Sequence, residues 1–235
     1  MLHLKGSSGD EIMERMIRET EIYYRNGVDA VLVENYFNGT EACVRALEYL
    51  YENMPEKKYG VNILGDHSMA FELAAQYEAD FIQIDSVCGH LTPKKDAAYA
   101  EELECLMQYR SFQVLGGLRF KYNPVRSGRT FEQDAELAMQ RCDAVVTTGA
   151  ATGEECQTEK LAEFRAALKE FPLIVGAGVT ADNVCEKLQY ADGVIIGSWL
   201  KWGHCDHGDV YEEYVIELMD RVREFRRTSK QQKTN

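Results

Sequence analysis

Two strand-like runs lie near the end of the sequence: PLIVGAGVTADN at residues 172–183 and DGVIIGSWLK at residues 192–201. Each run leads from a short apolar strand directly into a glycine turn, and a helix is expected after the first turn. Glycine at such a turn lets the backbone approach a ligand closely. Two consecutive units of this kind are typical of the last two units of a (β/α)8 barrel, where the turns often hold a phosphate.

The same alternation of apolar runs and amphipathic stretches extends back to the N-terminus. The predicted strands are Met1–Leu4, Ala30–Val33, Gly60–Leu64, Phe81–Asp85, Phe112–Leu115, Ala144–Thr147, Leu173–Val175 and Gly193–Ile196. The predicted helices are Asp10–Arg25, Thr40–Asn53, Ser68–Gln76, Lys95–Tyr109, Thr130–Gln140, Thr158–Glu170, Ala181–Leu188 and Val210–Arg226. This order predicts an α/β protein, a single (β/α)8 TIM barrel over residues 1–226. Residues 227–235 are expected to form a frayed polar tail.

One small feature recurs where predicted helices lead into strands. An aspartate stands just before the apolar run at Asp29, Asp80, Asp143 and Asp192. We interpret these residues as structural parts of tight turns at the end of the barrel opposite the active-site face.

Composition limits the classes of partner. The net charge of −13 argues against nucleic acid and anionic lipid, but it permits a small phosphorylated ligand held by backbone N–H groups. The seven cysteines are odd in number and form no CxxC pair, which favours a reducing cytoplasm over a disulfide framework. The sequence shows neither a signal peptide nor an apolar run of about 20 residues, so neither export nor a membrane span is predicted. A homo-oligomer is compatible with this fold class.

Five residues of the two closing turns are the predicted phosphate site. They are Gly176, Ala177, Gly178, Gly197 and Ser198, and Lys201 would add a positive charge if it faced inward. The alternative is that these glycines only form tight turns, but position and motif together favour phosphate. The TTGAATG segment at residues 147–153 is interpreted as a further ligand-contacting loop, with Thr148, Gly149, Thr152 and Gly153 as its candidates.

Carboxylates at the predicted strand ends are the candidate acid–base residues. Strand alternation directs Asp85 toward the barrel axis, where a carboxylate is costly to bury unless it is paired or used. Glu34 is the second candidate, and the sequence leaves open whether Glu34 or Asn35 faces the site. Asn62 and His3 are further candidates for ligand contact. A structural hydrogen bond across the barrel is at least as plausible for Asn62, and for His3, whose imidazole can titrate near neutrality, a satisfied core position is the commoner case.

The segment GGLRFKYNP at residues 116–124 is cationic within an acidic protein. Arg119 and Lys121 are therefore candidates for stabilising an anionic substrate, and solvated surface charges are the equal alternative. No metal site is predicted and no cofactor is firmly implied, although Glu34 and Asp85 could bind Mg²⁺. The His-Cys-Asp-His run at residues 204–207 lacks zinc spacing and is interpreted as a solvated loop.

Several of these segments together resemble the BtpA/SgcQ family, and the similarity extends from His3 to about Arg226. The segments that resemble the family are VEN at 33–35, GVNIL at 60–64, TGAATG at 148–153, GAGVTADN at 176–183 and Gly193–Lys201. The resemblance implies a TIM barrel of the phosphate-binding kind. One branch of the family is associated with photosystem I biogenesis, and other members are described only as enzymes without an assigned reaction.

The functional prediction is an enzyme acting on a small phosphorylated metabolite, such as a sugar phosphate or a phosphoribosyl or nucleoside-like compound. Its reaction would use Asp85 and Glu34 as acid and base, with Arg119 or Lys121 stabilising developing charge. Isomerase, lyase, and glycosidic-bond hydrolase or phosphorylase chemistry all fit such a site. The alternative is a non-catalytic binding or assembly factor of the BtpA type, active in biogenesis of a photosystem or membrane complex.

Overall fold

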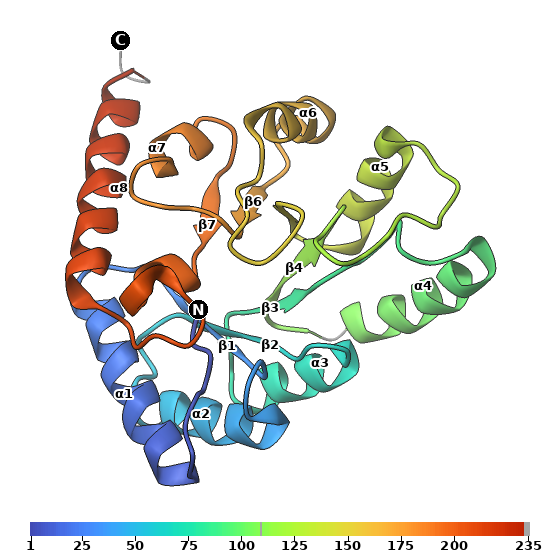
Figure 1. The fold of residues 1–235 in the computed structure, drawn as a ribbon. Coiled ribbons are helices and arrows are strands. Elements are labelled where there is room, and N and C mark those ends of the chain that lie inside the picture. The colour runs from blue at the N-terminus through green and yellow to red at the C-terminus, as the bar shows by residue number, and fades with distance from the viewer. Residues whose placement is uncertain (109, 233–235) are drawn as a thin grey trace.

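The computed structural model describes residues 1–108 and 110–232 of the chain. Within this range, parallel strands form one sheet whose order follows the chain, with each strand bonded to the next (Figure 1). The strands are β1 (Val31–Glu34), β2 (Tyr59–Asn62), β3 (Phe81–Ile84), β4 (Gln113–Gly117), β5 (Ala144–Thr148), β6 (Leu173–Gly176) and β7 (Gly193–Ile195). Sequential parallel order with a helix after each strand is the topology of a curled α/β barrel.

Helices surround the strands on the outside of the sheet (Figure 1). They are α1 (Gly9–Arg25), α2 (Gly39–Asn53), α3 (His67–Gln76), α4 (Pro93–Met107), α5 (Phe131–Arg141), α6 (Thr158–Leu168), α7 (Val184–Lys187) and α8 (Glu212–Gln232), with the 3₁₀ turns η1 (Ser198–Leu200) and η2 (Trp202–His204) after β7. Local sequence fixes several helix starts. The Ser8 hydroxyl accepts from Glu11 N–H, the Asp66 carboxylate accepts from Met69 N–H, and Thr130 forms a capping box with Gln133.

The predicted barrel architecture is confirmed, but the described residues form seven strands and not eight. The predicted first strand, Met1–Leu4, makes only a single parallel bridge between Leu2 and Val33. It cannot extend further because Leu4 has a φ of 43°, which takes the backbone out of the extended conformation. On its other side, the Met1 amine donates to the Ile196 carbonyl at 2.9 Å, next to the last strand.

The last two helices, α7 and α8, also differ from their predicted bounds. α7 spans four residues where Ala181–Leu188 was expected. Residues 181–183 form a turn ahead of it, in which Thr180 and Asn183 bond each other reciprocally. α8 continues to Gln232, past the Arg226 at which the sequence prediction ended it. Residues 233–235 of the predicted tail lie outside the described residues.

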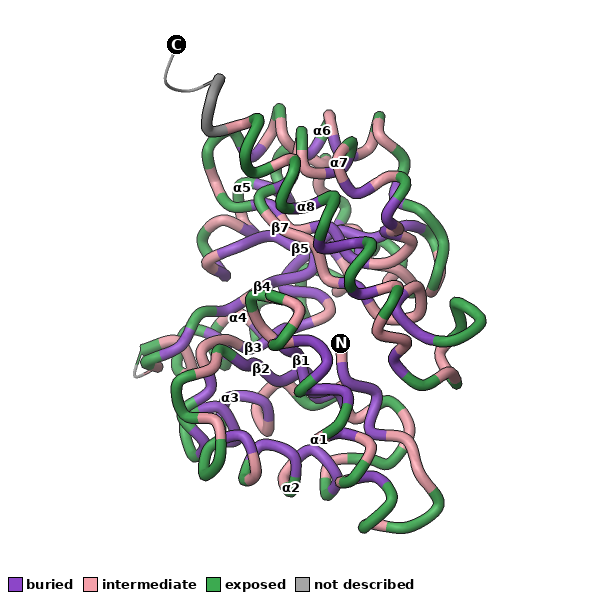
Figure 2. The backbone as a smooth tube through the Cα atoms, turned by 90° about the vertical axis from the view of Figure 1, so that its left-hand side faces the viewer, coloured by how far each residue is buried: buried purple, intermediate pink, exposed green. Residues whose placement is uncertain are grey.

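The core lies between the strands and the helices, where aliphatic side chains of both are buried. Figure 2 marks the buried residues in purple along the backbone. Residues paired in register point to the same face of a sheet, so the pairing of Glu34 with Asn62 places both side chains on one side. In β3, Ile82 and Ile84 are buried in the apolar layer. Their neighbours Gln83 and Asp85 point to the opposite face, toward the barrel axis, as the alternation predicted.

Three of the recurring aspartates tie each strand start to the strand before it. Each makes two hydrogen bonds of 2.7–3.0 Å to one residue: its carboxylate accepts that residue's backbone N–H, and its own backbone N–H donates to that residue's carbonyl. The pairs are Asp80 with Tyr59, Asp143 with Val114, and Asp192 with Leu173. Asp29 instead pairs with Arg226 of α8 at 2.6 Å. The structural role predicted for these residues is therefore confirmed.

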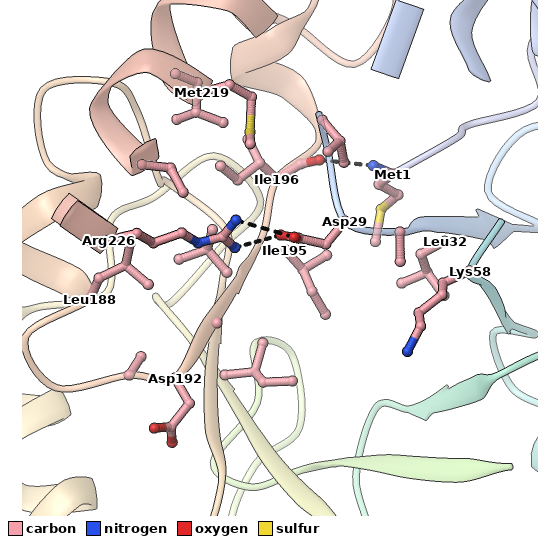
Figure 3. Close-up of a pocket in the computed structure, with 18 of the residues that line it drawn as sticks. Met1, Asp29, Leu32, Lys58, Leu188, Asp192, Ile195, Ile196, Met219 and Arg226 are labelled. Atoms are coloured by element: carbon pink, nitrogen blue, oxygen red, sulfur yellow. Dashed lines mark hydrogen bonds and ion pairs between the residues drawn. The ribbon is translucent and has the colours of Figure 1, made fainter. Parts of the chain in front are cut away.

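A cavity of about 1140 Å³ opens at this same end of the barrel and not at the end that bears the predicted site. Figure 3 shows it between the β7 region and α8, with the ion pair of Asp29 and Arg226 at its edge. Its walls include Leu32, Ile196 and Met219. It lies where the bonding between β7 and the N-terminal segment is sparse, so we attribute the space to the incomplete closure of the sheet.

Candidate functional site

Four polar side chains converge at the carboxyl ends of β1, β2 and β3. The Asn62 side-chain amide donates to Glu34 Oε1 at 3.0 Å and to Asp85 Oδ1 at 3.2 Å. The amide of Gln83 donates to the same Asp85 oxygen at 3.1 Å. The structure thus brings Glu34, Asp85 and Asn62 together, with the Asn62 amide between the two carboxylates.

Glu34 is the most perturbed acid of this network. Its side chain is 7% exposed, and burial together with the negative charge of Asp85 raises its pKa from 4.5 to about 7. The amide of Asn62 and the positive charge of Lys121 act in the opposite direction. A carboxyl group with such a pKa can both give and take a proton near neutral pH.

The choice between Glu34 and Asn35 is settled by their partners. Glu34 faces Asn62 inside the barrel, whereas Asn35 turns the other way and accepts the Leu64 N–H at 2.7 Å. Asn35 therefore braces the turn after β2, and Glu34 is the residue at the site.

Lys121 approaches the same region from the turn after β4. Its backbone N–H donates to the Thr148 hydroxyl at 2.8 Å, and its ammonium group donates to the Thr152 hydroxyl at 2.9 Å. Lys121 also lines a cavity of about 590 Å³ together with Tyr122, Gly149 and Glu154. The threonine loop and the cationic loop thus form one wall of the mouth, and Lys121 is close enough to lower the pKa of Glu34.

Arg119 does not join the carboxylates. Its guanidinium donates to Asp134 at 2.9 Å, and Asp134 is fully buried in α5, where Arg129 and Ser127 also bond it. A buried carboxylate needs such partners, so the positive charge of Arg119 is committed to holding α5. The structure offers no contact that would let Arg119 stabilise charge at Glu34 or Asp85.

The two predicted phosphate turns begin side by side, because Gly176 pairs with Ile195 in the sheet. Ala177 and Gly178 both have positive φ, at 62° and 61°, and Gly178 donates no backbone hydrogen bond within the described residues. The space beside each glycine is occupied, however. A side chain at Gly178 would overlap the backbone of Glu154 and Glu155, and one at Gly197 would meet the imidazole of His3 at 3.2 Å. Gly153, with a φ of 79°, has open space around it.

Two residues of the predicted ligand set carry unexpected contacts. The Ser198 hydroxyl donates to the carboxylate of Asp206, so a negative charge already lies at this part of the predicted phosphate site. His3 is 6% exposed, its ring lies tilted against that of Tyr36 with centroids 5.2 Å apart, and burial lowers its pKa to about 3. His3 is therefore neutral at physiological pH.

Sequence reasoning missed the position of Asp206 and the state of Lys201. Asp206 was interpreted as part of a solvated loop, but it turns inward to Ser198 and to the hydroxyl of Tyr36 at 3.3 Å. Lys201 does face inward. It is 1% exposed, and its ammonium nitrogen has no hydrogen-bond partner among the described residues. The signal available was the position of Lys201 directly after the last glycine turn.

Neither a metal centre nor a membrane span is found in the described part of the chain. No group of three or more His, Cys, Asp or Glu side chains there could hold a metal ion. None of the described helices combines the length and apolar character needed to cross a bilayer.

Comparison with known proteins places the chain among relatives of the same length. The model of the BtpA family matches residues 4–224. The chain belongs to the BtpA family. An uncharacterized protein of Thermococcus kodakarensis is 29% identical, over 97% of this chain and 96% of its own length. The photosystem I biogenesis protein BtpA of Synechocystis is 25% identical, over 88% of this chain and 77% of its own length.

Among solved structures, this BtpA-family chain is similar in fold to the N-(5'-phosphoribosyl)anthranilate isomerase of Pyrococcus furiosus. The TM-score is 0.58 with 18% sequence identity, and the match covers 88% of this chain and 94% of the isomerase. At this level of identity the likeness supports the barrel fold alone.

Proposed function

We propose that this BtpA-family protein is an enzyme that acts on a small phosphorylated metabolite by carboxylate acid–base catalysis at the mouth of its barrel. The observation that carries the proposal is the pair of Glu34 and Asp85 on either side of the Asn62 amide, with the pKa of Glu34 raised to about 7. A buried acid poised near neutrality at the carboxyl ends of barrel strands is an arrangement typical of catalysis.

Each residue of the network has a role in this proposal. Glu34 moves a proton to or from the substrate, and Asp85 both raises the pKa of Glu34 and flanks the reacting carbon from β3. Lys121 stabilises negative charge that develops when the proton is removed. Asn62 fixes the carboxylates relative to each other, since one amide bonds both. Such a set suits an isomerase, a lyase, or an enzyme that cleaves a glycosidic bond.

The substrate class rests on the paired glycine turns after β6 and β7, which are the sequence signature of a phosphate site. A small anionic ligand also agrees with a chain whose net charge of −13 disfavours nucleic acid. All seven cysteines are free thiols, which supports a reducing compartment such as the cytoplasm.

The experiment is a thermal-shift screen of the full chain against phosphorylated metabolites, followed by a turnover assay with the compounds that bind. A ligand that binds only the native state raises the melting temperature. Glu34→Gln and Asp85→Asn should then fold and bind but lose turnover by about 10²- to 10⁴-fold, the usual contribution of a positioned acid or base. Asp182→Asn, on an exposed residue, is the control. Full turnover by Glu34→Gln would refute the proposal.

A non-catalytic assembly role is the second candidate, and it rests on the relative named as a photosystem I biogenesis protein. The two candidate functions differ in whether the polar residues at the mouth of the barrel carry out a reaction. An assembly factor would retain its function in Glu34→Gln and Asp85→Asn, since neither change disturbs the outer surface of the helices.

A further inference from the structure

The segment after η1 sends one carboxylate back into the mouth of the barrel. Along residues 202–209 the side chains of Cys205 and His207 are exposed, but Asp206 between them is turned inward. Its two oxygens accept hydrogen bonds from the hydroxyls of Ser198 and Tyr36. Tyr36 lies on the turn after β1 and Ser198 on the turn after β7, so Asp206 bridges the two sides of the incompletely closed sheet.

The positive charge of Lys201 lies near this carboxylate and makes no hydrogen bond. Lys201 is fully buried, and its ammonium nitrogen has no acceptor among the described residues. Burial lowers its pKa to about 8, although the negative charges of Glu19, Asp206 and Glu34 act in the opposite direction. The Ser198 hydrogen bond and the charge of Lys201 hold the pKa of Asp206 below its usual value, although burial alone would raise it. The Nδ1 atom of His3 in the same region is also buried and unpartnered.

Burying an ammonium group without a hydrogen-bonded counter-ion costs several kcal/mol. The carboxylates of Glu19, Asp206 and Glu34 lie near enough to offset part of this cost, but none of the described residues accepts a hydrogen bond from the Lys201 ammonium group. A buried ammonium group of this kind is a candidate binding group for an anion. The hydroxyls, the imidazole and the ammonium group together are the donor set that an oxyanion of more than one charge would satisfy.

We propose that Ser198, Tyr36, His3 and Lys201 form the subsite for the ligand's phosphate, and that Asp206 occupies this subsite until the phosphate displaces it. This proposal rests on the proposed function and adds which side of the mouth recognises the phosphate. In this proposal the phosphate is bound by side chains at the mouth and not by the backbone of the turn after β6, because the backbone of Glu154 and Glu155 fills the space beside Gly178.

Displacement requires no unfolding of the segment. Its base is fixed, because Trp202 N–H donates to the Asp209 carbonyl at 2.8 Å and Asp209 pairs with Arg15 at 2.7 Å. Asp206 lies at the tip, between Cys205 and Gly208, so rotation of its side chain is enough to vacate the hydroxyls.

The test measures the affinity of the full chain for inorganic phosphate and for ribose 5-phosphate by calorimetric titration. Asp206→Asn removes the competing charge and keeps the size of the side chain. If Asp206 occupies the subsite nine-tenths of the time, its removal should tighten binding by about tenfold, because apparent affinity scales with the fraction of competent sites. Asp182→Asn removes the same charge from an exposed position on the turn after β6 and should change affinity less than twofold.

Lys201→Met supplies the second arm. It should abolish phosphate binding in both the wild-type and the Asp206→Asn background, with folding checked by circular dichroism. Equal or weaker phosphate binding by Asp206→Asn overturns the proposal, as does a gain of the same size in Asp182→Asn. If metabolites bind in the screen described above but Asp206→Asn is unchanged, the subsite assignment fails while the proposed function stands. If no phosphorylated compound binds any variant, both fail.

Discussion

Replacement of Glu34 by glutamine should make the protein more stable at alkaline pH. Glutamine keeps an oxygen that can accept from Asn62 but cannot ionise. In the folded chain the pKa of Glu34 is about 7, against 4.5 for an unperturbed glutamate. Between these two pH values the folded state binds more protons than the unfolded state, so stability falls as the pH rises through this window.

The magnitude follows from the size of the shift. Each pKa unit corresponds to about 1.4 kcal/mol, so the ionisation of Glu34 costs about 3 kcal/mol at pH 8 and less than about 1 kcal/mol at pH 5. Glu34→Gln should therefore exceed the wild type in free energy of unfolding by about 3 kcal/mol at pH 8. For a chain of this length, the change corresponds to a rise in melting temperature of roughly 5 to 10 °C.

The assay is urea unfolding of both proteins at pH 5 and pH 8, followed by fluorescence. The difference between the two proteins, and not the pH dependence of either alone, isolates Glu34, because all other titrating groups are shared. Parallel curves for wild type and variant across this range would show that Glu34 ionises normally. The case for a poised acid at the mouth would then be lost.

Three further outcomes are expected. Gly178→Ala should lower stability by at least about 1 kcal/mol in a denaturant titration, because its φ is positive and the added carbon meets the Glu154–Glu155 backbone. Asp134→Asn should cost about 3 kcal/mol by the same measurement, since it leaves the partly buried Arg119 without its counter-ion while Arg129 retains Asp96. Lys121→Met should raise the pKa of Glu34 above about 7, as measured by carboxyl-carbon NMR titration, because a favourable positive charge is removed.

The arrangement of the carboxylates was predictable from local pattern. A period of two along a strand and the parallel order of the strands are enough to direct Asp85 inward and to bring it near Asn62. The raised pKa of Glu34 was not predictable in the same way, since it depends on complete burial beside a second charge. The ambiguity between Glu34 and Asn35 was resolved only by the Leu64 N–H, which the turn after β2 presents to Asn35.

The errors arose where a side chain depends on a distant partner. Arg119 follows β4 as a catalytic cation would, but its partner Asp134 belongs to the next helix. Asp206 lies in a polar run that reads as solvated loop, and its contact with Tyr36 joins residues 170 positions apart. The first strand was expected from the apolar run Met1–Leu4, although a strand also needs neighbours to bond, and Leu2 finds only one bridge.

The aspartate ties at the strand starts have a consequence for how the molecule can change. They join β3, β5 and β7 each to the strand before it at one rim, using atoms that no ligand at the opposite rim would contact. The hydrogen bonds that hold neighbouring strands together and the residues proposed to bind the ligand thereby lie at opposite ends of the barrel. Relatives could exchange every loop around the mouth, and so alter what they recognise, while the joints between successive units stay intact.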